Sequence, residues 1–260
     1  MKNTEKKDED LVKIVQPLVD WYRENKRDLP WRHNPDAYRV WISEIMLQQT
    51  RVEAVKGYYD RFLKALPTVK DLAEAEEDKL LKLWEGLGYY NRVRNMQKAA
   101  QQIMVDHEGI FPDTYEEILQ LKGIGNYTAG AISAFAYGIP KPAVDGNVLR
   151  VISRITGSYE DIMKQSVRKK IENTLEQVIP SDAASDFNQG LIELGAIVCV
   201  PNGEPKCEEC PVASLCQAYC HGTVDRFPVK AAKKERRQEH KTVFIIQDGE
   251  ATALRKRPSK

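Results

Sequence analysis

The stretch LKGIGNYTAGA, residues 121–131, places Gly123 and Gly125 one residue apart, between TYEEILQL and NYTAGAISAFAYG. Both flanking segments have helical patterns. Glycine lets a backbone turn and approach a ligand closely, because it has no Cβ atom to clash. We therefore expect two helices joined by a glycine hairpin. The free N–H groups at the start of the second helix could bind phosphate without reading bases, although a plain helix–helix turn explains this stretch equally well.

Hydrophobic residues recur at three- and four-residue spacing over most of the chain, which predicts an all-α protein. The segment DKLLKLWEGLGYYNRVRNMQKAAQQIM (78–104) predicts two helices joined at Gly86-Leu87-Gly88. After Phe227-Pro228 the pattern changes, and KAAKKERRQEH predicts a basic linker. KTVFIIQDGEATAL then predicts a β-hairpin around Asp248-Gly249. Because a lone hairpin is marginal in water, we expect a truncated β-containing domain to begin here.

The composition excludes few functions, but the sequence does indicate the cellular compartment. The chain has 260 residues, 42% of them hydrophobic, and a net charge of +1. The first ten residues, MKNTEKKDED, lack an apolar signal segment, and no apolar run reaches membrane-spanning length. We therefore expect a cytoplasmic protein that does not contact a membrane. From Arg226 to Lys260, eleven Lys or Arg residues face four Asp or Glu, which suits a phosphate-binding stripe or a solvated linker.

All five cysteines lie between Cys199 and Cys220. Such confinement is unlike a disulfide framework, whose cysteines would spread along the chain. The spacing is Cys199-x7-Cys207-x2-Cys210-x5-Cys216, with Cys220 beyond it. Four thiolates this close could hold a tetrahedral zinc ion or a [4Fe-4S] cluster. The uneven spacing favours the cluster, because zinc sites usually present two close pairs.

Two carboxyl residues stand in positions that suit acid–base chemistry. Glu44, in YRVWISEIML, has apolar helical neighbours, so burial should raise its pKa and suit it to a general acid. Asp145, in KPAVDGNVLRVISRI, precedes a helix whose N–H groups and dipole would keep it ionised. A surface glutamate and a simple N-cap are the ordinary interpretations. Two carboxyls whose pKa values are pushed apart could instead form a catalytic pair.

Several segments occur in a telling order: PWR (30–32), WISEIMLQQT (41–50), LWEGLGYYNRVRN (83–95), LKGIGNYTAGAI (121–132), VDGNVLRV (144–151), FNQGLIELGA (187–196) and the cysteine run. Together, over about residues 10–228, they resemble the MutY-type adenine DNA glycosylases of the helix-hairpin-helix superfamily.

The resemblance implies an all-α fold of two helical domains, with DNA lying across the cleft between them. Residues 33–138 would form a six-helix barrel domain that contains the helix-hairpin-helix motif. Residues 1–32 and 139–226 would form a domain that ends in the [4Fe-4S] cluster loop. Residues 227–241 would be a basic linker, and residues 242–260 the start of a truncated C-terminal domain that recognises 8-oxoguanine.

The implied activity is hydrolytic removal of adenine mispaired with 8-oxoguanine or guanine in double-stranded DNA, by a monomer. The adenine must leave the duplex to react. Glu44 matches the acid that protonates it, Asp145 matches the residue that stabilises the oxocarbenium-like sugar, and Asn147 supports the site. Tyr127 stands where bifunctional relatives have a lysine that attacks the sugar. Because a phenol cannot form a Schiff base, we expect base removal without strand cleavage.

Other residues match family positions that contact the DNA or the base. Trp31 and Arg32 would line the adenine pocket or nearby DNA, and Gln189 would hydrogen-bond the base. Gln49 and Tyr89 would wedge into the duplex near the target pair. The ordinary alternatives are a core tryptophan, a surface arginine and a loop tyrosine. The full set is Trp31, Arg32, Gln48, Gln49, Thr50, Leu87, Gly88, Tyr89, Gly123, Gly125 and Gln189.

The chain departs from the family pattern in two places. The spacer between Cys199 and Cys207, VPNGEPK, is one residue longer than usual, and Lys122 replaces a customary proline. We still expect Cys199, Cys207, Cys210 and Cys216 to hold the cluster, although Cys220 could replace one of them.

Two rival functions belong to the same superfamily: an endonuclease III-like glycosylase with lyase activity, and a thymine-mismatch glycosylase. A rival of another class is a non-catalytic DNA-binding module whose cysteines hold zinc.

Overall fold

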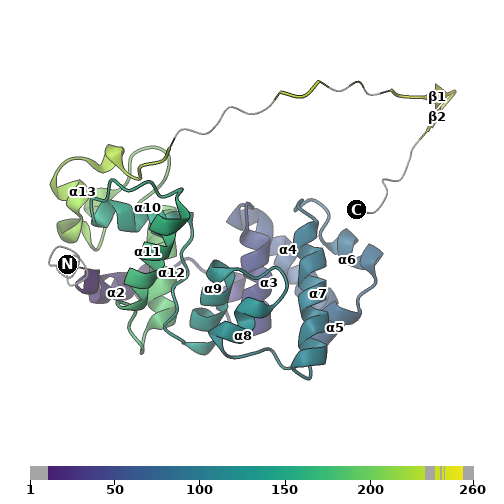
Figure 1. Cartoon of the computed structure of the whole chain (residues 1–260), viewed down its shortest axis with the longest axis horizontal. Coiled ribbons are helices and arrows are strands. Elements are labelled where there is room, and N and C mark those ends of the chain that lie inside the picture. Colours follow the sequence, from purple (N-terminus) through teal and green to yellow (C-terminus); the bar gives the residue numbers. More distant parts are fainter. Residues whose placement is uncertain (1–10, 232–237, 241, 243, 254–260) are drawn as a thin grey trace. The chain divides into compact units, whose positions relative to one another are not determined.

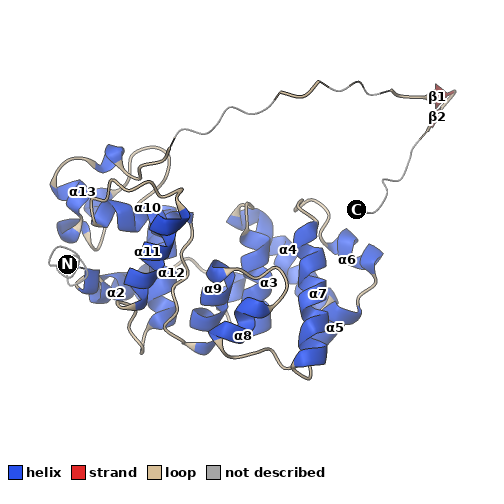
Figure 2. Cartoon of the chain, viewed as in Figure 1, coloured by secondary structure: helices blue, strands red, loops and turns tan. Residues whose placement is uncertain are grey.

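The computed structural model describes residues 11–231, 238–240, 242 and 244–253. It divides into two compact units, Met1–Lys230 and Ala231–Lys260. Figures 1 and 2 show that the first unit is built from helices joined by loops, which confirms the predicted all-α class. Residues 1–10, 232–237, 241, 243 and 254–260 lie outside the described residues. They include parts of the predicted iron–sulfur cluster domain, linker and C-terminal domain.

The α-helices of the described residues are α2 (Val15–Asn25), α3 (Ala37–Leu47), α4 (Val52–Ala65), α5 (Val69–Glu74), α6 (Glu77–Leu83), α7 (Asn91–Asp106), α8 (Tyr115–Gln120), α9 (Asn126–Tyr137), α10 (Gly146–Ile155), α11 (Gln165–Glu176), α12 (Ala184–Ile197) and α13 (Gln217–Cys220). Short 3-10 turns are η1 (Pro30–Arg32), η2 (Cys207–Glu209), η3 (Ala213–Leu215) and η4 (Val224–Arg226). None of the helices among these residues is long and apolar enough to span a lipid bilayer.

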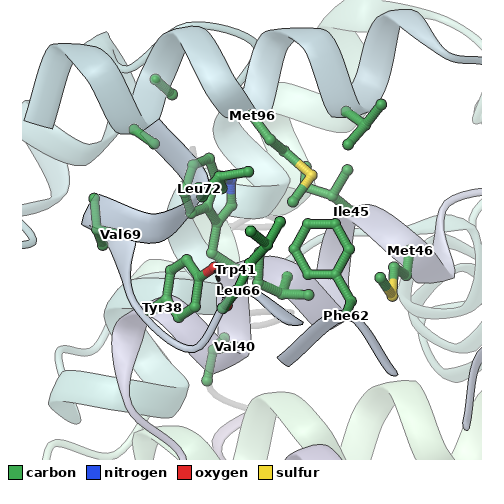
Figure 3. Close-up of a cluster of buried hydrophobic side chains, with 14 of the residues drawn as sticks. Tyr38, Val40, Trp41, Ile45, Met46, Phe62, Leu66, Val69, Leu72 and Met96 are labelled. Atoms are coloured by element: carbon green, nitrogen blue, oxygen red, sulfur yellow. Dashed lines mark hydrogen bonds between the residues drawn. The ribbon is translucent and has the colours of Figure 1, made fainter. Parts of the chain in front are cut away.

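One hydrophobic core joins helices α3 to α9. Trp41 lies at its centre with no exposed surface, and its ring meets the edges of Tyr38 and Phe111. Figure 3 shows side chains from α3, α4, α5 and α7 converging there. The Tyr38 hydroxyl, the only polar group of that side chain, donates a hydrogen bond to the Leu66 carbonyl at 2.8 Å. This lobe therefore gives α3 a rigid support of large, fully buried side chains.

A separate core joins α2, α10 and α12 with the cysteine-containing loop. It includes Leu18 from α2, Val148 from α10 and Phe187 from α12, all buried. Helix α12 packs against α2, α10 and α9, so it connects this core to the α3–α9 lobe. Gly138, which has a left-handed backbone, ends α9 where we predicted the first domain to end; the domain bounds stay a prediction.

The glycine hairpin joins α8 to α9, as the sequence predicts. Gly123 has φ +81°, and a Cβ atom there would lie 2.8 Å from the Asn95 Cβ atom. Both the backbone conformation and the close approach therefore require glycine. Gly125 differs, because it is the N-cap of α9 and a Cβ atom there would meet open space.

The second unit contains a short antiparallel hairpin, β1 (Gln247–Asp248) and β2 (Ala251–Thr252). Asp248 pairs with Ala251, so Gly249 and Glu250 form the turn, one residue later than predicted. Gly249 has φ +58°, which suits the primed turns that two-residue hairpins prefer. The predicted hairpin is thus present, with the glycine as the first of its two turn residues.

Candidate active site

A cavity of about 670 Å³ lies between the two lobes, within the size range of small-molecule sites. Its walls come from η1, α3 and α9 on one side and from α10 and α12 on the other. The predicted site residues that line it are Trp31, Arg32, Glu44, Gln48, Gln49, Thr50, Tyr127, Asp145, Asn147 and Gln189. The structure thus brings together residues from widely separated stretches of sequence.

Glu44 lies on α3 at the wall of the cavity and is only 6% exposed. Burial, with a smaller contribution from the charge of Asp145, raises the pKa of its carboxyl to about 7. A hydrogen bond from Tyr127 and the charge of Arg32 oppose these effects without cancelling them. The predicted rise is therefore present, and near neutral pH this carboxyl exchanges a proton readily.

Tyr127, in the first turn of α9, donates its hydroxyl to Glu44 Oε2 at 2.6 Å. Burial and the neighbouring Glu44 charge raise the pKa of Tyr127 well above its usual value. The phenol consequently stays protonated and remains a donor. It occupies one Glu44 oxygen and leaves the other, Oε1, for a group inside the cavity.

Asp145 is the N-cap of α10 and accepts from the Val148 backbone N–H at 2.8 Å. Asn147 Nδ2 donates to its second oxygen, also at 2.8 Å. The capping role was predicted correctly, but the expected direction of the pKa shift was wrong. Burial raises the pKa of Asp145, because the loss of solvent outweighs the N–H donors and the Arg150 charge that favour its ionised form.

A chain of hydrogen bonds runs from Asp145 through Asn147 to the cysteine loop. Arg150 Nη2 donates to Asn147 Oδ1 at 2.8 Å, and Arg150 Nε donates to the Cys199 carbonyl at 2.8 Å. Gly195 allows this arrangement, because a Cβ atom there would lie 2.6 Å from the Asn147 Cβ atom. The orientation of the Asp145 carboxylate is therefore coupled to the loop that carries the first cysteine.

Another part of the cavity lining combines an aromatic ring with polar side chains. Trp31 is buried and packs edge-on against Tyr59, with 5.7 Å between ring centroids. Gln189 Oε1 accepts from the Tyr22 hydroxyl at 2.8 Å and from Arg32 Nε at 3.2 Å. The amide of Gln189 is thus held in one orientation beside the cavity.

Sequence reasoning missed Glu193, which lines the cavity one helical turn beyond Gln189 and has no exposed surface. Arg27 binds it through Nε and Nη2, at 2.7 and 2.9 Å, and Arg32 Nη2 donates to it at 2.8 Å. Burial raises the pKa of Glu193, but these hydrogen bonds outweigh it and hold the value at about 2. The i to i+4 spacing from Gln189 to Glu193 in FNQGLIELGA was the available signal.

The remaining predicted DNA-contact residues lie away from the cavity. Leu87, Gly88 and Tyr89 form the connection between α6 and α7, where Tyr89 is 66% exposed. Gly123 and Gly125 lie in the exposed part of the α8–α9 hairpin.

The four predicted cluster ligands, Cys199, Cys207, Cys210 and Cys216, line one apolar pocket. Cys220 is exposed, and its thiol lies 3.5 Å from the Ser214 carbonyl oxygen, outside that pocket. Within the described residues, no three His, Cys, Asp or Glu side chains converge as the ligands of a single metal ion would. The four thiols therefore surround a shared space without meeting at one point.

Comparison with known proteins places these features in a family. Residues 42–179 match the model of the HhH-GPD superfamily base excision DNA repair proteins. An adenine DNA glycosylase of Buchnera aphidicola (subspecies Acyrthosiphon pisum, strain APS) is 40% identical over 232 residues, which cover 89% of this chain and 66% of that protein. The adenine DNA glycosylase of Mus musculus is 43% identical over 219 residues, covering 81% and 42% respectively.

Among solved structures, a thermostable thymine-DNA glycosylase is similar, with a TM-score of 0.74 and 33% identity. The alignment covers 84% of this chain and 99% of the solved chain. Against the two adenine DNA glycosylases, by contrast, the chain spans less than two thirds of their length.

Proposed function

Because this chain belongs to the HhH-GPD superfamily of base excision DNA repair proteins, we propose that it is a monofunctional adenine DNA glycosylase. Its substrate would be adenine mispaired with 8-oxoguanine or guanine in double-stranded DNA, bound by one copy of the chain. The observation that carries the proposal is the 2.6 Å hydrogen bond from Tyr127 to Glu44 in a cavity shared with Asp145. This bond leaves the other oxygen of Glu44 free to contact a ligand. The Glu44 carboxyl has a pKa near neutrality and shares the cavity with the Asp145 carboxyl.

In this reaction, Glu44 would donate a proton to the ring of an adenine that has left the duplex and entered the cavity. A pKa of about 7 keeps a large fraction of this carboxyl protonated at neutral pH, unlike an ordinary glutamic acid. Protonation makes the base a better leaving group. After departure, the ionised Glu44 could accept a proton from the attacking water.

Asp145 would stabilise the positive charge that develops on the sugar as the bond to adenine breaks. Its carboxylate is fixed by the Val148 N–H and by Asn147, so it need not reorganise when the charge appears. It must be ionised for this role, and its raised pKa means that it ionises at a higher pH than an ordinary aspartate.

Tyr127 supports hydrolysis without strand cleavage. Strand cleavage by a glycosylase requires an amine that forms a Schiff base with the sugar. Among the described residues, no lysine lines the cavity, and Lys122 is exposed three residues before Gly125, the N-cap of α9. Water is therefore the nucleophile that these surroundings supply.

The cysteine pocket would hold a [4Fe-4S] cluster through Cys199, Cys207, Cys210 and Cys216. Four cysteines around one apolar space suit such a cluster, and their uneven spacing differs from the two close pairs usual in zinc sites. When bound, the cluster would tie four points of the loop together. Cys210→Ser should lose colour and iron, whereas Cys220→Ser, the matched control, should keep both. Stoichiometric zinc in place of iron would refute the assignment.

Release of free adenine from defined duplexes tests the function directly. Adenine opposite 8-oxoguanine or guanine should be released by the chain and not by Glu44→Gln, with strand breaks only after alkali. Cleavage without alkali would indicate a lyase.

The similarity to a thymine-DNA glycosylase makes thymine opposite guanine the essential competing substrate. Release of thymine, with adenine left in place, would refute the proposal. A module that only binds DNA would release neither base, and it would gain nothing from a buried Glu44 that lacks a cation partner at hydrogen-bonding distance among the described residues.

A further inference from the structure

Arg92, in the first turn of α7, donates hydrogen bonds to two loops of the α3–α9 lobe: the one that follows α3 and the one that joins α6 to α7. Its Nη1 atom donates to the carbonyls of Ile45 and Gln48, both at 2.7 Å. Its Nη2 atom donates to the carbonyls of Leu87 and Gly88, at 3.0 and 3.4 Å. One planar group thus joins the end of α3 to the connection between α6 and α7.

The surroundings of Arg92 leave the guanidinium little freedom. Its charge lies 5.3 Å from the Trp84 ring centroid and 5.7 Å from that of Tyr89. Its Nε atom is buried with no hydrogen-bond partner among the described residues. Burying an unpaired N–H is costly, so the four carbonyl contacts must outweigh that cost. A lysine could not reproduce them, because it has no planar fork of donors.

Each joined loop carries one non-glycine residue with a left-handed backbone. Gln49 has φ +58° and Tyr89 has φ +47°, two of the four such residues that the structure describes. Both side chains are exposed, and Gln49 also lines the rim of the active-site cavity. Residues held in such conformations tend to have a function that depends on them.

We infer that Arg92 is a positioning residue for base extrusion: it fixes the spacing between Gln49 and Tyr89, so that both side chains enter the duplex together. The inference rests on the proposed function, since it assumes that a base leaves the DNA to reach the cavity. Extrusion unstacks a base pair, and side chains that fill the vacated space offset part of that cost. Two independently moving loops would fill it less well.

Fluorescence of 2-aminopurine, which rises when this adenine analogue is unstacked, measures extrusion separately from chemistry. The analogue is placed opposite guanine, and the protein carries Glu44→Gln so that base release does not interfere. Arg92→Lys should lower the extrusion equilibrium about tenfold, as expected for about one lost charged hydrogen bond. The control is Arg94→Lys, two residues away, where an exposed arginine pairs with Glu77. It should change extrusion by less than about twofold.

A role in folding alone would affect every substrate equally. Opposite an abasic-site analogue the base is unpaired and extrusion costs less, so the defect of Arg92→Lys should shrink to about twofold there. Equal loss on both duplexes, or no loss on either, would overturn the inference. Wild type that neither extrudes 2-aminopurine nor releases adenine would instead refute the proposed function.

Gly88→Ala provides a second perturbation of the same loop, should Arg92→Lys fail to fold. Gly88 has φ +68°, and a Cβ atom there would meet open space, so alanine strains the loop backbone without a clash. Extrusion of the paired analogue should again fall, by about fivefold, with little change for the unpaired one. Uniform loss on both would count against the positioning role.

Discussion

The α3 wall and the α12 wall of the cavity each bury a glutamate, Glu44 and Glu193, and the two carboxyls have opposite pKa shifts. Burial raises the pKa of Glu44 to about 7, whereas Arg27 and Arg32 hold that of Glu193 at about 2 despite burial. Both side chains have little or no exposed surface, so solvent access does not explain the difference. The deciding factor is the partner: a neutral phenol for Glu44 and two guanidinium groups for Glu193.

This difference separates the chemical role from the structural one. A carboxylate bonded by two arginines cannot readily take up a proton, and its ion pairs hold η1 and the segment after α2 against α12. A carboxyl with one phenol partner gains a proton easily, at the expense of stability when it is ionised. The α12 wall therefore fixes the shape of the cavity, and the α3 wall supplies its acid.

The largest expected effect comes from removing the acid. Glu44→Gln keeps the size of the side chain and an acceptor for Tyr127, but cannot donate a proton of suitable acidity. Release of adenine should fall by about a thousandfold or more, within the range for loss of a general acid. Single-turnover release opposite 8-oxoguanine measures it, with Glu24→Gln, at an exposed position on α2, as control. Activity within about tenfold of wild type would show that Glu44 is not the acid.

Removing the charge of the other carboxyl should damage stability instead. Glu193→Gln leaves Arg27 and Arg32 without a negative partner, which should lower the free energy of unfolding by about 3 kcal/mol. Urea unfolding near neutral pH measures it. Asp186→Asn, on the same helix, breaks an exposed pair with Arg23 and should lower the free energy of unfolding far less. If both variants lost the same free energy of unfolding, the buried ion pairs of Glu193 would stabilise the protein no more than the exposed pair does.

The sequence predicted the surroundings of Glu44 on α3 better than the contacts of Glu193 on α12. Apolar neighbours of Glu44 lie within one helical turn, so a local pattern was enough to predict a raised pKa. The helix start at Asp145 was equally local. Its pKa direction depended on burial between two lobes, which no local pattern contains.

Contacts between distant segments account for the rest of what was missed. Glu193 meets Arg27 across 166 positions, and Arg92 meets Ile45 across 47. An arginine at either position looks like an ordinary surface charge in the sequence. Only the folded chain brings the acceptors to these arginines, because tertiary packing rather than helical periodicity sets their distance.

The opposed shifts also predict opposed pH dependences of stability. The raised pKa of Glu44 means that the folded state binds its proton more tightly than the unfolded state does. Protonated Glu44 therefore contributes stability that is fully present below about pH 4.5 and is lost as the pH rises through about 7. Glu44→Gln should therefore gain stability over wild type, by up to about 3 kcal/mol, as the pH rises from about 4.5 to about 8.

For Glu193 the sign reverses. Its folded pKa is depressed to about 2, so its ion pairs contribute fully above the ordinary glutamate pKa, and that contribution is lost as the pH falls towards 2. The stability gap between wild type and Glu193→Gln should shrink over that acidic window and stay constant above it. Urea unfolding at a series of pH values measures the free energy of unfolding of wild type, Glu44→Gln and Glu193→Gln. If that free energy changed with pH in the same way for all three, the two glutamates would not have opposed pKa shifts.

The smallest expected effect concerns the phenol that moderates Glu44. Tyr127→Phe removes a hydrogen bond that lowers the pKa of Glu44, so this pKa should rise by up to about one unit. Because the acid must be protonated, the alkaline fall in adenine release should move to higher pH by the same amount. Tyr137→Phe is the control, since its hydroxyl lies on the same helix and donates to the Phe111 carbonyl instead. If the alkaline fall in adenine release moved to lower pH instead, Tyr127 would act on Glu44 in some way other than stabilising its ionised form.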